Sequence, residues 1–312
     1  WFTTLFPVAL DPLGEPGEAI KRVKESLRRI PDKGLGHGVL RHLGNAAQQQ
    51  ALRTLPRAQV VFNYLGQFDA GFDERAQWVL AQEPSGAPVD AGAPLTHEFA
   101  VNGQVYEGVL TLRVSYSQAR HDRSAVAGWV QRFQQELEAL VGHCTSGAQG
   151  VTPSDFPLAR IGPQQLDALP VPAANLVDLY PLSPMQAGML FHSLYAPGGS
   201  AYVNQLRVDI DGLDVARFKA AWRALLERHE VLRTGFLVGE PALQWVARQI
   251  ELPMAEHDWR GRSDLGRALD DLAQAQLAQG FDLAQPPLMR LVLVHTHDDR
   301  HHFVWTMHHL LL

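Results

Sequence analysis

Apolar residues along the chain recur at two different spacings, which predict helices in some segments and strands in others. Helical spacing covers 20–30, where Pro31 ends the helix, and 126–141, which predicts one long amphipathic helix. Strands are predicted at 1–10, 60–65 and 107–117. Asn102-Gly103 is a hairpin signal before the last of these strands, and glycines at 34, 36 and 38 predict a flexible loop. Residues 1–144 therefore form a first α/β piece.

Residues 145–178 differ in composition from the pieces on either side. Prolines stand at 153, 157, 163, 170 and 172 with short polar clusters between them. This composition is typical of an interdomain linker, with a small helix at 163–169.

The third piece covers 179–312 and again mixes both spacings. Ser183 is placed to cap a helix that runs to Leu194, and Asp214 to cap one that buries Phe218, Trp222, Leu225 and Leu226. Further predicted elements are strands at 202–210, 232–238, 288–297 and 302–309 and a helix at 264–277. The 288–297 strand is apolar enough to be buried on both faces. The predicted fold class is α/β.

Composition and charge exclude several classes of protein. The 312 residues are 46% hydrophobic and 19% charged, with a formal net charge of −6. That charge argues against a nucleic-acid partner, and no apolar run is long enough to span a bilayer. Cys144 is the one cysteine, so no internal disulfide forms, which fits a reducing cytoplasm. We expect a cytoplasmic protein without a membrane segment.

Two adjacent histidines, His308 and His309, end the last predicted strand. Side chains alternate along a strand, so the two imidazoles point to opposite faces and cannot do one job together. We expect one to be a packed structural residue and the other to face a cavity.

Three motifs in the third piece, in this order, resemble condensation domains of nonribosomal peptide synthetases. The segment 180–191 (YPLSPMQAGMLF) resembles the first core motif, and 228–236 (RHEVLRTGF) resembles the second. Met307-His308-His309 begins the third, HHxxxDG, whose aspartate would follow Leu312. We therefore expect the chain to be a segment of a longer protein.

The first piece carries a second set of motifs, which resemble those of epimerization domains. Residues 1–7 (WFTTLFP) resemble the fifth motif, and 31–38 (PDKGLGHG) resemble the sixth, with His37 where the family has Tyr. The hexapeptide at 62–67 (FNYLGQ) matches the seventh closely.

This resemblance implies the C-terminal lobe of an epimerization domain at 1–144, a Pro-rich linker at 145–178, and the N-terminal lobe of a condensation domain at 179–312. Both would be half-domains of the chloramphenicol-acetyltransferase-like fold. The implied parent epimerizes a carrier-bound aminoacyl or peptidyl thioester from L to D. It then joins the D-configured donor to a carrier-bound L-aminoacyl acceptor.

The implied partners are peptidyl carrier domains upstream and downstream, together with the adenylation domain of the next module. No cofactor is expected to bind directly, because 4′-phosphopantetheine is carried by the carrier domains. A G-x-S-x-G nucleophile elbow is absent from the sequence, which agrees with a reaction on an already activated thioester.

The resemblance also implies roles for individual residues. His309 is the candidate catalytic residue: an imidazole can accept a proton from the attacking amine, or orient it and stabilise the tetrahedral intermediate. His308, Arg228 and Arg233 are structural motif residues, and Arg233 is expected to pair with the motif aspartate. Asn63 and Tyr64 are candidates for epimerization, with a purely structural role for Tyr64 equally open.

Two alternatives compete with this interpretation. The six histidines between 295 and 309 suggest a metal site, although no cysteine is near them. The chain can also be a non-catalytic platform that positions carrier proteins, and the isolated chain is expected to be inactive.

Overall fold

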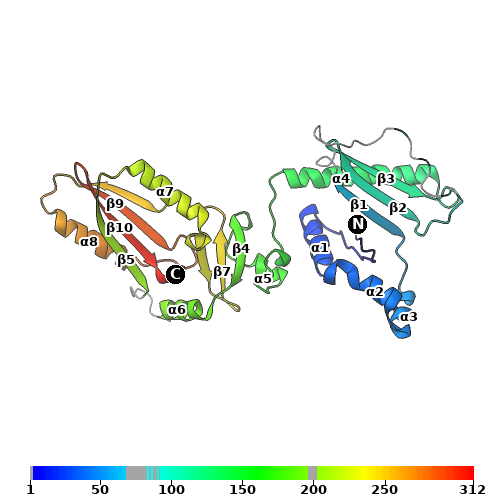
Figure 1. Ribbon diagram of the computed structural model, residues 1–312, viewed down its shortest axis with the longest axis horizontal. Helices are drawn as coiled ribbons and strands as arrows, with labels where there is room; N and C mark the ends of the chain where they lie inside the picture. Colours follow the sequence, from blue (N-terminus) through cyan, green and yellow to red (C-terminus); the bar gives the residue numbers. More distant parts are fainter. Residues whose placement is uncertain (1–2, 68–82, 84–85, 87–89, 91, 196–201) are drawn as a thin grey trace. The chain divides into compact units, whose positions relative to one another are not determined.

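The chain folds into two compact units, Trp1–Ala148 and Gln149–Leu312, in a computed structural model. The structure describes residues 3–67, 83, 86, 90, 92–195 and 202–312. Figure 1 shows the helices and strands of each unit. Within the described residues, no helix is long and apolar enough to cross a bilayer.

The first unit contains a small sheet together with several helices. Its elements are α1 (Pro16–Arg28), η1 (Pro31–Gly34), α2 (Leu35–Leu43), α3 (Ala46–Thr54), β1 (Val60–Gln67), β2 (Phe99–Tyr106), β3 (Val109–Tyr116) and α4 (Arg123–Thr145). Helix α4 lies against the sheet, where Trp129 stacks on Phe99 with ring centroids 5.5 Å apart. Among the described residues of the first unit, the buried hydrophobic ones are Val101 and Val126. The long helix and the strand at 60–65 are thus confirmed.

The predicted hairpin at Asn102-Gly103 is wrong. These residues lie in the middle of β2, which pairs in parallel with β1 and antiparallel with β3, and the tight turn follows at Glu107-Gly108. Gly103 serves close packing instead of a turn. A Cβ there would lie 2.8 Å from Leu112 Cδ2 and 3.3 Å from Tyr64 Cδ2.

The glycine-rich loop predicted at 34–38 is also wrong beyond its first residue, because α2 begins at Leu35. Gly34 has φ +79°, and a Cβ there would overlap the Phe6 ring, so glycine is required. Thr4 Oγ1 donates to Lys33 O at 2.8 Å. The described part of the predicted 1–10 strand, residues 3–10, is not a strand, and Trp1 and Phe2 lie outside the described residues.

The second unit is larger and has most of the buried core. Its elements are η3 (Pro153–Asp155), α5 (Pro163–Asp167), η4 (Ala173–Asn175), β4 (Leu176–Pro181), α6 (Pro184–Tyr195), β5 (Val203–Asp211), α7 (Val215–Arg228), η5 (Glu230–Arg233), β6 (Thr234–Leu237), β7 (Leu243–Ala247), β8 (Met254–Asp258), α8 (Leu265–Ala278), β9 (Met289–His297), β10 (Arg300–His308) and η6 (His309–Leu311). The predicted caps are confirmed: Ser183 Oγ accepts from Gln186 N at 3.2 Å and Asp214 Oδ1 from Arg217 N at 3.0 Å.

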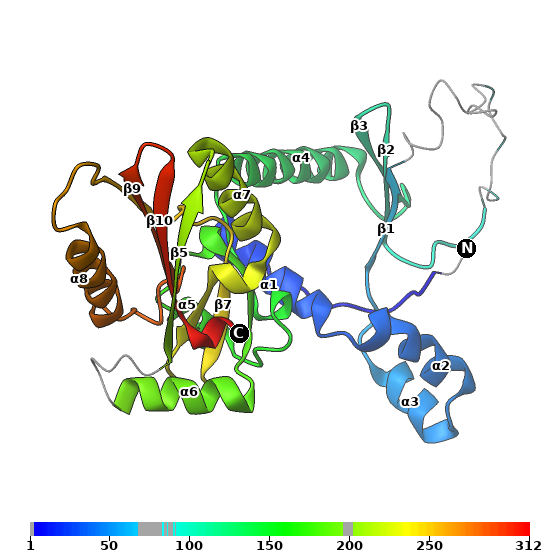
Figure 2. The ribbon, with the colours of Figure 1, turned by 60° about the vertical axis from the view of Figure 1, so that its left-hand side comes forward.

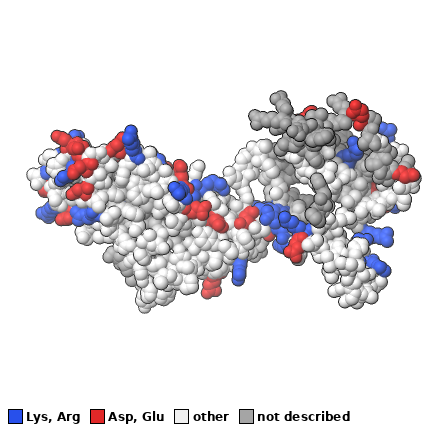
Figure 3. All heavy atoms as spheres, viewed as in Figure 1, with Lys and Arg blue, Asp and Glu red and all other residues white. Residues whose placement is uncertain are grey.

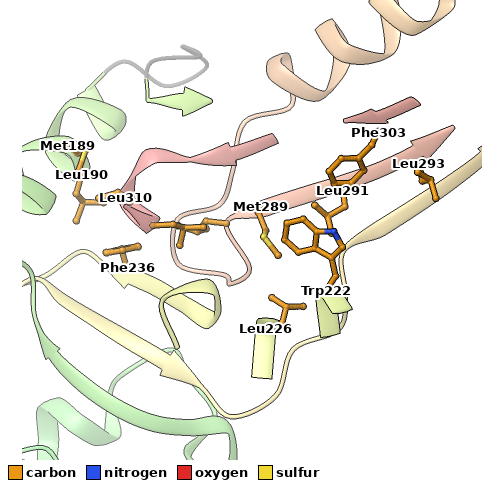
Figure 4. Packing of buried hydrophobic residues seen from close by; sticks show 12 residues of the cluster. Met189, Leu190, Trp222, Leu226, Phe236, Met289, Leu291, Leu293, Phe303 and Leu310 are labelled. Atoms are coloured by element: carbon orange, nitrogen blue, oxygen red, sulfur yellow. The ribbon is translucent and has the colours of Figure 1, made fainter. Parts of the chain in front are cut away.

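The larger sheet of this unit has the strand order β5-β10-β9-β8. Helices α7 and α8 cover opposite faces of it (Figures 1 and 2). On the α7 face, Trp222 lies against Phe303, with ring centroids 6.0 Å apart (Figure 4). The ring centroid of Trp305 is 5.3 Å from that of Trp222. Strand β9 is buried along nearly its whole length, as predicted. The predicted burial of Leu225 beside Trp222 is wrong, because Leu225 is 40% exposed.

Most of the predicted linker packs as part of the second unit. Residues from Gln149 onward belong to that unit, and Phe156, Ala159, Ile161 and Leu166 are buried against the smaller sheet β4-β7-β6. These apolar residues between the prolines hold the segment on the second unit, because removing their side chains from water stabilises the packed state. The predicted short helix is present as α5.

Candidate functional site

The paired histidines lie where β10 ends and the 3-10 helix η6 begins. The backbone of His308 still belongs to the sheet region, since its N–H donates to Leu288 O at 2.9 Å. His309 N–H donates to Tyr202 O at 2.7 Å. Leu310 and Leu311 then turn into the core and are almost fully buried. This sequence of one buried, one exposed and two buried residues fixes the two imidazoles in different surroundings.

His308 is a buried, hydrogen-bonded residue, 3% exposed. Leu310 N–H donates to its Nδ1 at 3.2 Å, so the neutral ring has its proton on Nε2. Nε2 lies 3.3 Å from Ser193 Oγ and donates to it, while Ser193 Oγ donates to Met189 O at 2.8 Å. Burial, with a smaller contribution from the charge of His309, lowers the pKa of His308 to about 4.

His309 is exposed, and its imidazole is oriented by a neighbouring strand. Asn204 of β5 lies opposite Met307 in the sheet, and its Nδ2 is 2.9 Å from His309 Nδ1. With this orientation of the amide, Nδ1 accepts and Nε2 has the ring proton. Rotating the amide by half a turn brings Oδ1 to Nδ1 and leaves Nε2 as an acceptor. Asn204 therefore sets whether the outer nitrogen gives or takes a proton.

Arg233 is buried and makes its hydrogen bonds to backbone carbonyls. Its guanidinium donates to the carbonyl oxygens of Leu226, Glu227, Ala247 and Arg248. It thereby ties the end of α7 to the end of β7. Pairing with an aspartate beyond Leu312 stays a prediction. Arg228, the last residue of α7, is exposed.

The candidate epimerization residues lie together on β1 in the first unit. Asn63 Nδ2 donates to Asn102 Oδ1 at 3.3 Å, and Tyr64 is 51% exposed beside Gly103. Segments of the fifth and sixth motifs meet in the same unit, through Phe6 against Gly34. His37, from the sixth motif, lies half-buried in α2.

The histidine-rich hairpin does not form a metal centre in the described part of the chain. No group of at least three His, Cys, Asp or Glu side chains is placed to hold an ion among those residues. His295 and His301 instead stack with centroids 4.4 Å apart and planes 5° apart. His302 Nδ1 pairs with Asp209 Oδ1 at 2.6 Å.

A cavity of about 720 Å³ lies next to His308, within the second unit. Its walls come from residues 161–170, the end of α6, residues 236–243 and residues 280–284. His308 lines this cavity and His309 does not, so the packed histidine is also the cavity histidine. Sequence patterns missed Ser193 and Asn204, because their contacts with the histidines span more than 100 residues of chain.

Comparison with known proteins identifies a family for this chain. A family model described as a condensation domain matches residues 1–156 and 177–312. The chain belongs to the condensation-domain family.

Relatives of this condensation-family chain are much longer than it is. It is 38% identical to one of the linear gramicidin synthase proteins from Brevibacillus parabrevis and 32% identical to one of the mycosubtilin synthase proteins from Bacillus subtilis. It aligns over its whole length with both but spans 4% and 12% of theirs. The starter condensation domain of rhizomide synthetase is 22% identical with a TM-score of 0.40, over 42% of this chain and 31% of that one.

Proposed function

We propose that this chain supplies parts of two neighbouring domains of a nonribosomal peptide synthetase. Residues 1–144 are the C-terminal lobe of an epimerization domain and 179–312 the N-terminal lobe of a condensation domain. The family match over two segments and the two ordered sets of motifs support this division. Both lobes have the chloramphenicol-acetyltransferase-like fold, and their mixed α/β elements agree with it.

The proposed condensation joins two thioesters held on 4′-phosphopantetheine arms of carrier domains. The α-amine of the acceptor attacks the thioester carbonyl carbon of a D-configured donor. The C–S bond breaks, the amide C–N bond forms, and the proton lost from the amine ends on the released thiol. The substrate brings its own activation, so no enzyme nucleophile is needed.

The observation that carries this proposal is the exposed His309 imidazole with Asn204 on its inner nitrogen. When the Asn204 amide donates to Nδ1, the outer Nε2–H donates to the oxyanion of the tetrahedral intermediate. When the amide is rotated, Nε2 accepts the amine proton as a general base. Either form uses the side of the ring that faces away from the protein.

The test uses the synthetase that contains this segment, with carrier domains loaded with donor and acceptor. Replacing His309 by Ala should reduce dipeptide formation by about 10²- to 10⁴-fold, the usual contribution of a positioned acid or base. The matched control is His229→Ala, since His229 is also exposed and follows α7. A His309→Ala enzyme that keeps the full single-turnover rate would exclude the proposal.

Variants of Asn204 separate the two roles of His309. In Asn204→Asp the carboxylate accepts from Nδ1–H, which frees Nε2 and favours the protonated ring. A general base should then show a pH profile of product formation displaced to higher pH, with activity retained. A ring that acts as a donor should instead be active at low pH, where both of its nitrogens are protonated, and should lose activity at high pH, where the neutral ring keeps its proton on Nδ1.

In the epimerization lobe, Tyr64 and Asn63 are proposed to border the site where Cα is deprotonated and reprotonated. Tyr64→Phe and Asn63→Ala should slow the conversion of the carrier-bound residue from L to D, measured by chiral chromatography after thioester cleavage. Thr111→Ala on β3 is a control in the same sheet. An unchanged L-to-D rate in both variants would assign these residues a structural role.

The isolated chain is proposed to have no turnover and to act at most as a platform for carrier proteins. Incubation with loaded carrier domains should give no peptide above the uncatalysed background. Product formation by the chain alone would refute this point and leave the role of His309 to the test above.

A further inference from the structure

The cavity beside His308 has walls that are mostly apolar. Ile161, Leu169 and Pro170 come from the segment predicted as a linker, and Phe236, Leu243 and Phe281 from the body of the unit. The volume of about 720 Å³ falls within the range of roughly 300–1,000 Å³ that small-molecule sites occupy. The cavity exists because residues 161–170 pack onto the lobe.

The charged residues that line this cavity, among those described, all have one sign. Glu240 and Asp282 line it and are exposed, and no Lys or Arg occurs among its described lining residues. The guanidinium of Arg290 lies behind the wall, where it stacks on Phe281 at 4.1 Å and donates to Gln276 and to Gly280 O. Helix α6, whose end forms one wall, has no Asp, Glu, Lys or Arg, and the surface around it shows few of these residues (Figure 3).

The polar pair inside the cavity does not form a nucleophile. A serine is activated when a neighbouring imidazole accepts its proton. Here Nδ1 of His308 is occupied by Leu310 N–H, so Nε2 donates to Ser193 Oγ and cannot take its proton. The low pKa of His308 keeps this ring neutral near pH 7, so it does not repel a cation. The cavity is therefore suited to binding and not to covalent chemistry.

We propose that this cavity binds an amphipathic primary amine, with its apolar body against the apolar walls and its ammonium group beside Glu240 and Asp282. A ligand with the same apolar part but a carboxylate in place of the ammonium is repelled by Glu240 and Asp282 and should bind more weakly. The site does not include His309, and the proposal stands whether or not His309 acts in condensation.

The test compares phenylethylamine, phenylethanol and phenylacetate, which share one aromatic body and differ in charge. Binding to the whole chain is measured at low ionic strength by isothermal titration calorimetry. The amine should bind about tenfold more tightly than phenylacetate, because the two exposed carboxylates attract an ammonium and repel a carboxylate. Phenylethanol should fall between them, and the preference should shrink at high salt.

Two sets of variants assign binding to this cavity. Glu240→Gln combined with Asp282→Asn should bring the affinity for the amine close to that for the alcohol. Asn at 282 keeps an oxygen that can accept from Ala284 N–H, as Asp282 Oδ1 does now. Ala168→Trp should fill the cavity and weaken all three ligands, whereas Ala174→Trp, exposed and not in the lining, should leave them unchanged.

Several results would overturn the proposal. These are the absence of binding by the amine, equal affinity for amine and phenylacetate, or a preference that the double variant leaves intact. Binding of all three ligands that survives Ala168→Trp would place them elsewhere. If that variant fails to fold by circular dichroism, Val238→Trp fills the same cavity from an exposed wall position.

Discussion

Removing the His308 imidazole should abolish a defined part of the acid sensitivity of the second unit. The ring is buried with a pKa of about 4, whereas an unfolded chain has its histidines near 6.5. Between these two pH values the His308 imidazole is protonated in the unfolded state and neutral in the folded state. The free energy of unfolding therefore falls as pH drops from about 6.5 to about 4, and is unaffected by this group above that range.

The size of this effect follows from the displacement of the pKa. At about 1.4 kcal/mol per unit, the change from 6.5 to about 4 amounts to about 3 kcal/mol. His308→Gln should cost about 1–2 kcal/mol near neutral pH, because the bonds to Leu310 N and Ser193 Oγ are disturbed. The variant should then lose less stability on acidification, so that it equals or exceeds the natural chain near pH 4.5.

Amide hydrogen exchange at Val292 and Val304 is the assay, because these residues lie in the core of the second unit and report its opening alone. His229→Gln is the control, since His229 is exposed. The difference in free energy of unfolding between the natural chain and His308→Gln should change by about 3 kcal/mol on acidification and reverse its sign, whereas the difference between the natural chain and the control should stay constant. Parallel pH profiles for His308→Gln and the natural chain would refute this account of the buried ring.

Three further outcomes are expected. Arg233→Lys should lower the free energy of unfolding by about 3 kcal/mol, because buried carbonyl oxygens lose their donors. The control Arg228→Lys, at an exposed position, should change it little, and equal urea midpoints for the two variants would contradict this account. A chain of 149–312 should unfold cooperatively. One of 177–312 should be less stable by about 5 kcal/mol or aggregate, since it lacks five buried apolar side chains, those of Phe156, Ala159, Ile161, Leu166 and Leu176. Equal melting temperatures would show that the segment is dispensable. Trp222→Ala should cost about 3–5 kcal/mol in urea unfolding, and a loss below about 1 kcal/mol would contradict the packing on Phe303.

Sequence periodicity predicts the second unit better than the first because its elements have clear apolar faces. The alternation that predicts opposite faces for His308 and His309 also holds along β10, where Phe303, Trp305 and Met307 share the side of the core cluster that includes Trp222 of α7. Strands β4, β7 and β8 were not predicted. The periodicity of such short segments is too brief to distinguish strand from loop.

Local turn signals failed where long-range contacts decide the backbone. Asn102-Gly103 is a hairpin signal in isolation, yet pairing with both β1 and β3 holds it extended. The proline-rich composition at 145–178 was likewise no guide to packing. Prolines mark breaks in regular structure, but they do not prevent Phe156 and Leu166 between them from packing into a core.

His308 and His309 differ in burial and in hydrogen bonding because of where strand β10 ends. Alternation predicts opposite faces for His308 and His309, and they do have opposite surroundings. The cause, however, is the end of β10 at His308 and the turn of Leu310 into the core. That turn supplies the N–H that fixes the tautomer of His308, and it leaves His309 exposed beside Asn204. Replacing Leu310 by a polar residue should therefore disturb both rings at once, although it touches the reactive face of neither.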